Sequence, residues 1–146
     1  MAQAKSKFSS NKPPGKGSII GLEQGKLPPQ AIELEEAVLG ALMIDKNALN
    51  DVIDILEPEC FYKDAHREIY SAIKNLFAES QPIDMLTVSA TLRKNGQLEL
   101  CGGDFGIANL TQKVSSSAHI EFHSRIIVQK HIQRSLIRVS SEIIND

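Results

Sequence analysis

The sequence has little of what marks secreted, membrane-spanning or disulfide-bonded proteins. It contains no Trp, 5% aromatic residues and two cysteines, Cys60 and Cys101, which do not form a CxxC pair. No run of 18 apolar residues is present, as a membrane-spanning helix requires, and the N-terminus lacks the apolar core of a signal peptide. We therefore expect a reduced, cytoplasmic protein that meets no membrane.

Motifs for catalysis and metal binding are also missing. There is no GxxxxGK(S/T) phosphate loop, no GxSxG nucleophile elbow and no HExxH zinc motif. His119, His123 and His131 share a helix face, but they lack an evident third ligand and are expected to be solvated. His66 is either a general base or, as we favour, a hydrogen-bonded packing residue. The chain alone is therefore expected to be no enzyme and to hold no cofactor or metal.

Charge is distributed unevenly along a chain of 146 residues with a net charge of −2, which is long enough for one domain. Residues 1–26 contain five Lys and one Glu, a net of +4, whereas the remainder contains 11 basic and 17 acidic residues, a net of −6. Residues 1–27, rich in Ser, Lys, Gly and Pro, are expected to be a flexible basic leader. Such a leader is either simply solvated or in contact with nucleic acid.

Apolar residues recur at helical spacing from residue 28 onward, so we predict an all-α fold. A globular part (28–115) of about five short helices is followed by one long projecting helix (116–146). Asp84 is the predicted cap of one helix, and the adjacent acids Glu33, Glu35 and Glu36 are explained by the dipole of the first helix. The predicted helices span residues 32–42, 48–56, 63–78, 85–94, 105–114 and 117–144. The predicted core comprises Val38, Leu42, Val52, Leu56, Ile69, Ile73, Phe77 and Leu92.

The last helix is apolar on two sides, which predicts two partners: its own domain and another molecule. It contains no Pro or Gly over roughly 28 residues, or about 42 Å at 1.5 Å per residue. One predicted face consists of Phe122, Ile126, Ile132, Leu136, Val139 and Ile143, and the other of Ile120, Ile127, Ile137 and Ile144.

Three basic residues, Lys130, Arg134 and Arg138, follow at a spacing of four along one side of the same helix. They form either a solvated face, supported by an Arg138–Glu142 pair, or a ridge that meets an acidic partner or nucleic-acid phosphates. A freestanding helical module that binds nucleic acid through this ridge and the leader is therefore an alternative function.

Several short blocks stand out along the chain: PPQ at 28–30, EAVLGAL at 36–42, LEPECFY at 56–62, AH at 65–66, PID at 82–84, LE at 98–99 with GG at 102–103, and SSAHIE at 116–121. Together these blocks resemble the N-terminal domain of bacterial replicative DNA helicases of the DnaB type. The resemblance covers about residues 28–144, with the blocks in the family order. Two departures are His119, where Asn is usual, and Phe105, which stands one position earlier than the family's aromatic residue.

The resemblance implies a collar and assembly domain of a ring-shaped hexamer that unwinds DNA with ATP. The long helix would be the first arm of a helical hairpin, truncated before its second arm, and the ATPase domain that holds ATP and Mg would follow beyond residue 146. Implied partners are other helicase subunits, primase, in some species a loader, and DNA through the assembled ring. The expected partner-binding residues are Arg134, Ile137, Arg138 and Phe105, and the expected self-association residues are Ile126, Ile127, Lys130 and Ile144.

Overall fold

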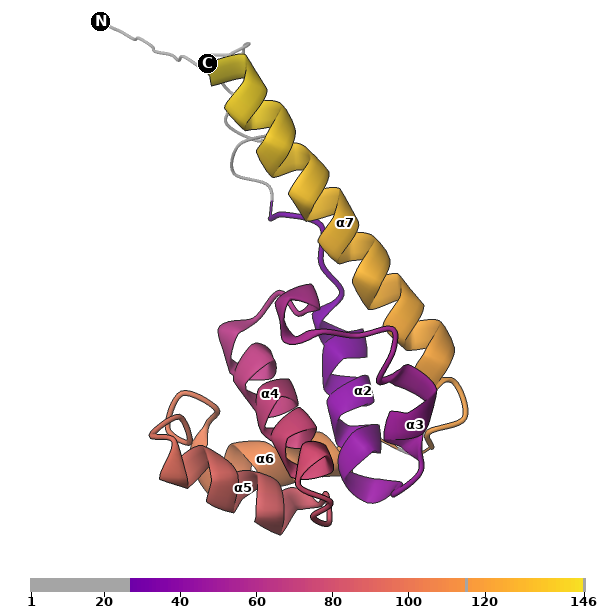
Figure 1. The fold of residues 1–146 in the computed structure, drawn as a ribbon, viewed down its shortest axis with the longest axis vertical. Coiled ribbons are helices and arrows are strands. Elements are labelled where there is room, and N and C mark those ends of the chain that lie inside the picture. The colour runs from indigo at the N-terminus through magenta and orange to yellow at the C-terminus, as the bar shows by residue number, and fades with distance from the viewer. Residues whose placement is uncertain (1–26, 115, 146) are drawn as a thin grey trace, which may run out of the picture.

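The computed structural model describes residues 27–114 and 116–145, and this part of the chain contains helices and no strand, which confirms the all-α prediction. Five short helices form a body, and the long last helix crosses it and extends beyond it (Figure 1). The elements are α2 (Ile32–Ile44), α3 (Ala48–Val52), the 3-10 turn η1 (Pro58–Cys60), α4 (Asp64–Ala78), α5 (Met85–Lys94), α6 (Gly103–Gln112) and α7 (Ile120–Asn145). The predicted leader lies outside the described residues except for Leu27.

Helix α2 is the centre of the body, because it packs against α3, α4, α6 and α7. Its residues 38–43 are all buried, so it has no solvent-facing side over that stretch. Gly40 allows the close approach of α6, since a Cβ atom there would collide with the carbonyl oxygen of Leu110. Helices α5 and α6 lie at the end of the body farthest from the C-terminal tip of α7 (Figure 1).

Local sequence signals set most helix ends. Asp84 caps α5 as predicted: its carboxylate accepts from the Thr87 backbone N–H at 2.9 Å, and the Thr87 hydroxyl accepts from the Asp84 N–H at 2.9 Å. Gly102, at φ 88°, supplies the left-handed residue from which α6 begins, so α6 starts before the predicted Phe105. The second helix ends at Val52 rather than at residue 56, and α7 begins at Ile120 rather than at residue 117.

The predicted core is confirmed except for Phe77, which is 43% exposed. Phe77 lies in the last turn of α4, where Leu76 takes the inward position that continues from Ile69 and Ile73. Two aromatic residues that we did not predict are fully buried instead. The rings of Phe61 and Tyr70 pack at 5.2 Å between centroids, and the Tyr70 hydroxyl donates to the carbonyl of Leu56 at 3.1 Å.

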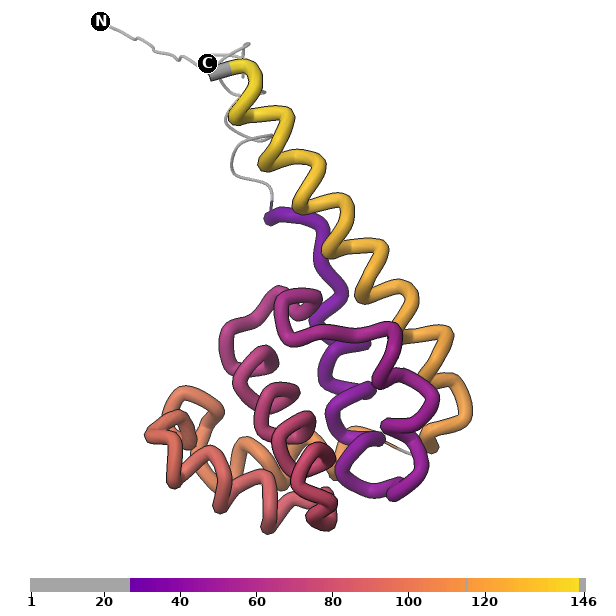
Figure 2. The backbone as a smooth tube through the Cα atoms, in the orientation of Figure 1, coloured from indigo at the N-terminus to yellow at the C-terminus, as the bar shows by residue number. Residues whose placement is uncertain are grey.

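Helix α7 is half packed and half free, as the tube in Figure 2 makes clear. Its first half buries Ile120, Ser124 and Ile127 against the body. From Leu136 to Ile144 every residue is exposed. The helix has 26 residues, or about 39 Å at 1.5 Å per residue, so its second half projects well beyond the body, as predicted. None of the described helices combines the length and the apolarity needed to cross a bilayer.

Candidate protein–protein interface on the long helix

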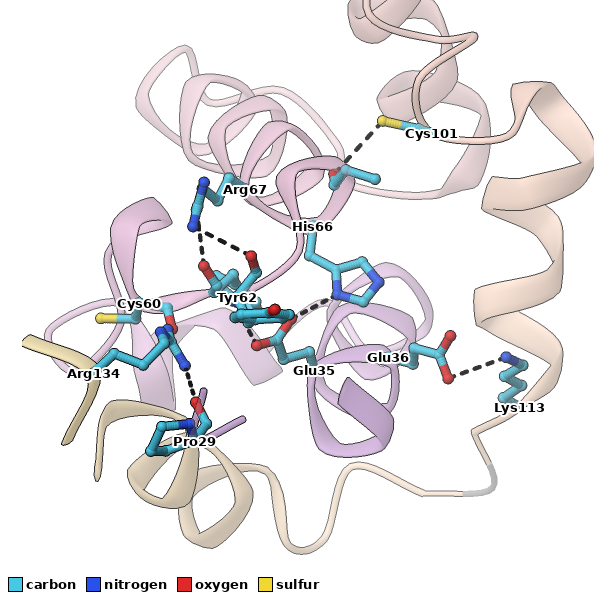
Figure 3. Close-up of polar contacts among 12 residues, drawn as sticks. Pro29, Glu35, Glu36, Cys60, Tyr62, His66, Arg67, Cys101, Lys113 and Arg134 are labelled. Atoms are coloured by element: carbon cyan, nitrogen blue, oxygen red, sulfur yellow. Dashed lines mark hydrogen bonds and ion pairs between the residues drawn. The ribbon is translucent and has the colours of Figure 1, made fainter. Parts of the chain in front are cut away.

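Arg134 fastens α7 to the body. Its guanidinium donates to the carbonyl oxygens of Pro29 at 2.7 Å and Cys60 at 2.8 Å, and it lies 5.4 Å from the centre of the Tyr62 ring (Figure 3). Partial burial lowers the pKa of Arg134, but the carbonyl oxygens and the ring face are all suited to a cation. Arg134 was predicted to bind a partner; in the structure its guanidinium is engaged within the chain, and a contact with a partner stays a prediction.

Beneath Arg134, the buried carboxylate of Glu35 holds the segment after η1 in place. It accepts from the Tyr62 backbone N–H at 2.7 Å, and its second oxygen lies 2.7 Å from Nδ1 of His66 (Figure 3). Arg67 donates to the carbonyls of Phe61 and Tyr62 from the other side. The favoured interpretation of His66 as a hydrogen-bonded packing residue is confirmed. Glu35 was explained by the helix dipole alone, whereas the structure shows that it is only 1% exposed and holds Tyr62 and His66 by hydrogen bonds.

The free half of α7 carries four exposed aliphatic side chains in one line. Their spacing of four, three and four residues places them on the same side of a helix, as in the seam of a coiled coil. We call this set the α7 stripe: Ile132, Leu136, Val139 and Ile143, which are 51%, 61%, 43% and 68% exposed. All four were predicted as one apolar face, but none was among the residues expected to bind a partner.

The predicted self-association residues lie in different surroundings. Ile127 is 1% exposed and belongs to the core, so it cannot meet a second molecule while the chain is folded, and this part of the prediction is wrong. The physical reason is that Ile120, Ser124 and Ile127 form the side of α7 that faces the body. Ile126 and Lys130 are half-buried beside that contact, and Ile144 is 80% exposed near the tip.

The predicted partner-binding residues do not form one surface. Ile137 is 54% exposed on the free half of α7, whereas Phe105 is 78% exposed on α6, at the other end of the molecule (Figure 1). Arg138 is exposed and pairs with Glu142 at 3.2 Å, as predicted. The basic ridge is interrupted at its centre, because Arg134 turns inward between Lys130 and Arg138. The alternative function, nucleic-acid binding through the basic ridge, is therefore less well supported, because the central arginine of the ridge is engaged within the chain.

The body offers no evident redox or metal chemistry in its described residues. No three His, Cys, Asp or Glu side chains of the described ranges lie close enough to hold a metal ion. Burial raises the pKa of the Cys101 thiol to about 11, and its Sγ donates to the carbonyl of Ala65. Burial likewise raises the pKa of Cys60. Neither sulfur is therefore a ready nucleophile.

Comparison with known proteins identifies relatives over most of the chain. The family model described as DnaB-like helicase N terminal domain matches residues 27–129. The replicative DNA helicase DnaB of Rhodothermus marinus is 43% identical over 114 residues, which are 78% of this chain and 12% of the relative. That of Geobacillus stearothermophilus is 40% identical over 121 residues, 83% of this chain and 27% of the relative. The chain therefore spans between an eighth and about a quarter of these relatives.

A solved structure agrees with the fold. The N-terminal domain of DnaB helicase from Mycobacterium tuberculosis superposes with a TM-score of 0.79 at 32% sequence identity, covering 82% of this chain and 83% of that one. The family match ends at residue 129, so the α7 stripe lies just beyond it.

Proposed function

Because the chain belongs to the family of DnaB-like helicase N-terminal domains, we propose that it is the collar and assembly domain of a hexameric replicative DNA helicase. In this proposal α7 joins neighbouring subunits, and the exposed surfaces receive primase and, where one exists, a helicase loader. Unwinding of DNA with ATP and Mg belongs to the other domain of a full-length helicase, since the described chain has neither a phosphate loop nor a catalytic constellation.

The observation that carries the proposal is the α7 stripe. Burying one Ile, Leu or Val side chain completely stabilises an interface by roughly 1.5–3 kcal/mol relative to its exposure. Association itself costs about 4–15 kcal/mol in lost freedom of motion. The four side chains are 43–68% exposed, so only about half of the gain from complete burial is available to an interface. Four such side chains from each of two helices then roughly balance the cost of association and favour weak pairing, which a ring that holds subunits at high local concentration would make effective.

Sedimentation equilibrium tests the assembly role. We expect the wild-type chain to self-associate weakly, with a dissociation constant in the micromolar range or above, and Leu136→Asp to abolish this. Ser141→Asp is the matched control, because it adds the same charge to an exposed position of the same helix outside the stripe. Equal loss of association in both variants, or none in Leu136→Asp, would contradict the assembly role of the stripe.

Calorimetry with the helicase-binding domain of the primase from the same organism tests docking. Ile137→Asp places an unpaired charge on the free half of α7. It should weaken primase binding at least tenfold, which corresponds to about 1.4 kcal/mol of binding free energy, without unfolding the body. Leu86→Asp is the control, since Leu86 is 73% exposed on α5. If Phe105→Asp weakens binding and Ile137→Asp does not, the primase meets the α6 end of the body instead.

A further inference from the structure

A cavity of about 270 Å³ opens on the body between α2, α4 and α6. No residue of α7 lines it, so it is separate from the α7 stripe. Its size is at the lower end for ligand pockets, which suits a small molecule or a single functional group. The polar side chains that line it are Glu36, Lys63, His66, Asn109 and Lys113.

His66 lines this cavity, and only one of its two ring nitrogens has a hydrogen-bond partner among the described residues. The residue is 3% exposed, and its Nδ1 is engaged by the Glu35 carboxylate at 2.7 Å. Its Nε2 has no hydrogen-bond partner among the described residues, and Figure 3 shows that this second nitrogen points away from Glu35, on the side where Lys113 lies. A ring nitrogen that reaches a polar cavity and has no hydrogen-bond partner there is a position where a ligand atom could bind.

Donors and acceptors are mixed around that nitrogen. Lys63 and Lys113 supply two positive charges, and the Asn109 amide supplies a further donor. Glu36 supplies an acceptor that now pairs with Lys113 at 3.1 Å. Nδ1 of His66 is engaged by Glu35, so Nε2 is the ring nitrogen that is left to hydrogen-bond with a ligand in the cavity. The set therefore matches an anion that carries both bare oxygens and an O–H group.

A metal ion fits this cavity less well than an anion does. The described residues bring no three suitable ligands together, and the nearby Cys101 thiol is protonated and donates a hydrogen bond to the carbonyl of Ala65. We propose that the cavity binds a protonated phosphate group, either of inorganic phosphate or of a small phosphomonoester. Lys63 and Lys113 contact the bare oxygens, the P–OH group donates to the Glu36 carboxylate, and His66 Nε2 forms a further hydrogen bond to the phosphate. Sulfate has the same shape but no proton at neutral pH, so one of its oxygens would face the Glu36 carboxylate without a proton between them, and sulfate should bind more weakly.

Titration of the ¹⁵N-labelled chain tests this site. At pH 7 and constant ionic strength, phosphate should cause saturable shifts in the His66 side-chain nitrogens and in the amides of Gly102 and Asn109. Sulfate should bind at least tenfold more weakly. A parallel titration with glycerol 3-phosphate distinguishes the two sources, since a tighter fit than phosphate assigns the site to a monoester. Identical responses to phosphate and sulfate, or no saturable shift with either phosphate or the monoester, would overturn the proposal.

Two surface variants locate the site without disturbing the core. Lys63→Gln removes one exposed charge at the cavity and should weaken phosphate binding about fivefold. Lys94→Gln is the matched control, because Lys94 is an exposed lysine of α5 outside the cavity, and its affinity should equal that of the wild type. The unshifted remainder of each spectrum reports that the fold is intact. Wild-type affinity in Lys63→Gln would overturn the assignment of the cavity.

Discussion

Arg134 is the residue whose replacement best separates a structural role from a docking role. Truncation to Ala removes two hydrogen bonds that cross from α7 to the body, to the carbonyls of Pro29 and Cys60. It also removes the contact with the Tyr62 ring at 5.4 Å. The segment at 29 and the turn at 60 would then lose their shared contact with the long helix.

The expected loss can be worked from these contacts. Hydrogen bonds from a charged donor contribute about 1.5–3 kcal/mol each, and an exposed cation–π contact contributes about 0.5–1 kcal/mol. Arg134 is only partly buried, so water can reach the abandoned carbonyls, and the net loss is reduced to roughly 2–3 kcal/mol. For a domain of this size such a loss lowers Tm by about 10 °C. Arg134→Lys keeps the charge but not the two-pronged geometry, so it should lose about half as much.

Urea denaturation followed by circular dichroism measures the difference. Arg138→Ala is the matched control, because Arg138 lies one turn further on, is exposed and pairs only with Glu142. We expect that control to cost no more than about 0.5 kcal/mol. If Arg134→Ala costs no more than Arg138→Ala, Arg134 does not fasten α7 to the body and the interpretation of the network in Figure 3 is refuted.

Three further outcomes follow from single contacts. Gly40→Ala should lower the free energy of unfolding by about 1–3 kcal/mol in urea denaturation, because the new Cβ atom collides with the Leu110 carbonyl oxygen. An unchanged free energy of unfolding would mean that α2 and α6 can move apart to accommodate the methyl group. The Ser117 hydroxyl bond lowers the pKa of Asp45, so Asp45 stabilises the fold above its ordinary pKa and loses that effect as pH falls through the lower folded-state value. Thermal melts of Ser117→Ala should therefore differ from wild type at pH 6, and the difference should shrink as the pH falls below the ordinary pKa of an aspartate. A difference that stays constant with pH would exclude this bond as the cause. Alkylation of Cys101 at pH 8 should be much slower in the native chain than in urea, since burial raises its pKa to about 11, and equal rates would contradict its burial.

Elements with short-range signals were predictable from the sequence. The start of α5 follows from Asp84 and Thr87, which interact within one turn, and its end follows from Asn95 and the left-handed Gly96, so the prediction of 85–94 agrees with the structure. The long helix was predictable because no Pro or Gly interrupts it. The prediction for Phe77 failed because periodicity did not decide between the adjacent residues Leu76 and Phe77 in the last turn of α4, and the packing buries Leu76.

The polar network could not be predicted because its partners are far apart in the sequence. Glu35 and His66 are 31 residues apart, and Arg134 and Cys60 are 74 residues apart. A spacing of four places Arg134 in line with Lys130 and Arg138, but only the packing of α7 decides which of them reaches the body. For the same reason Ile127 was predicted to lie on the surface, whereas it belongs to the core. The α7 stripe, by contrast, could be predicted as one apolar face from the spacing of its residues in the sequence.

Cross-linking at the α7 stripe tests the assembly role most directly. Val139→Cys places a thiol within the stripe and Ser141→Cys places one outside it, both at exposed positions of the same helix. The two native cysteines are buried and should react slowly with a short bis-maleimide. We predict that Val139→Cys yields covalent dimers whose amount rises with protein concentration, while Ser141→Cys stays monomeric. Equal cross-linking of both variants, or dimers from Ser141→Cys alone, would contradict the role of the stripe.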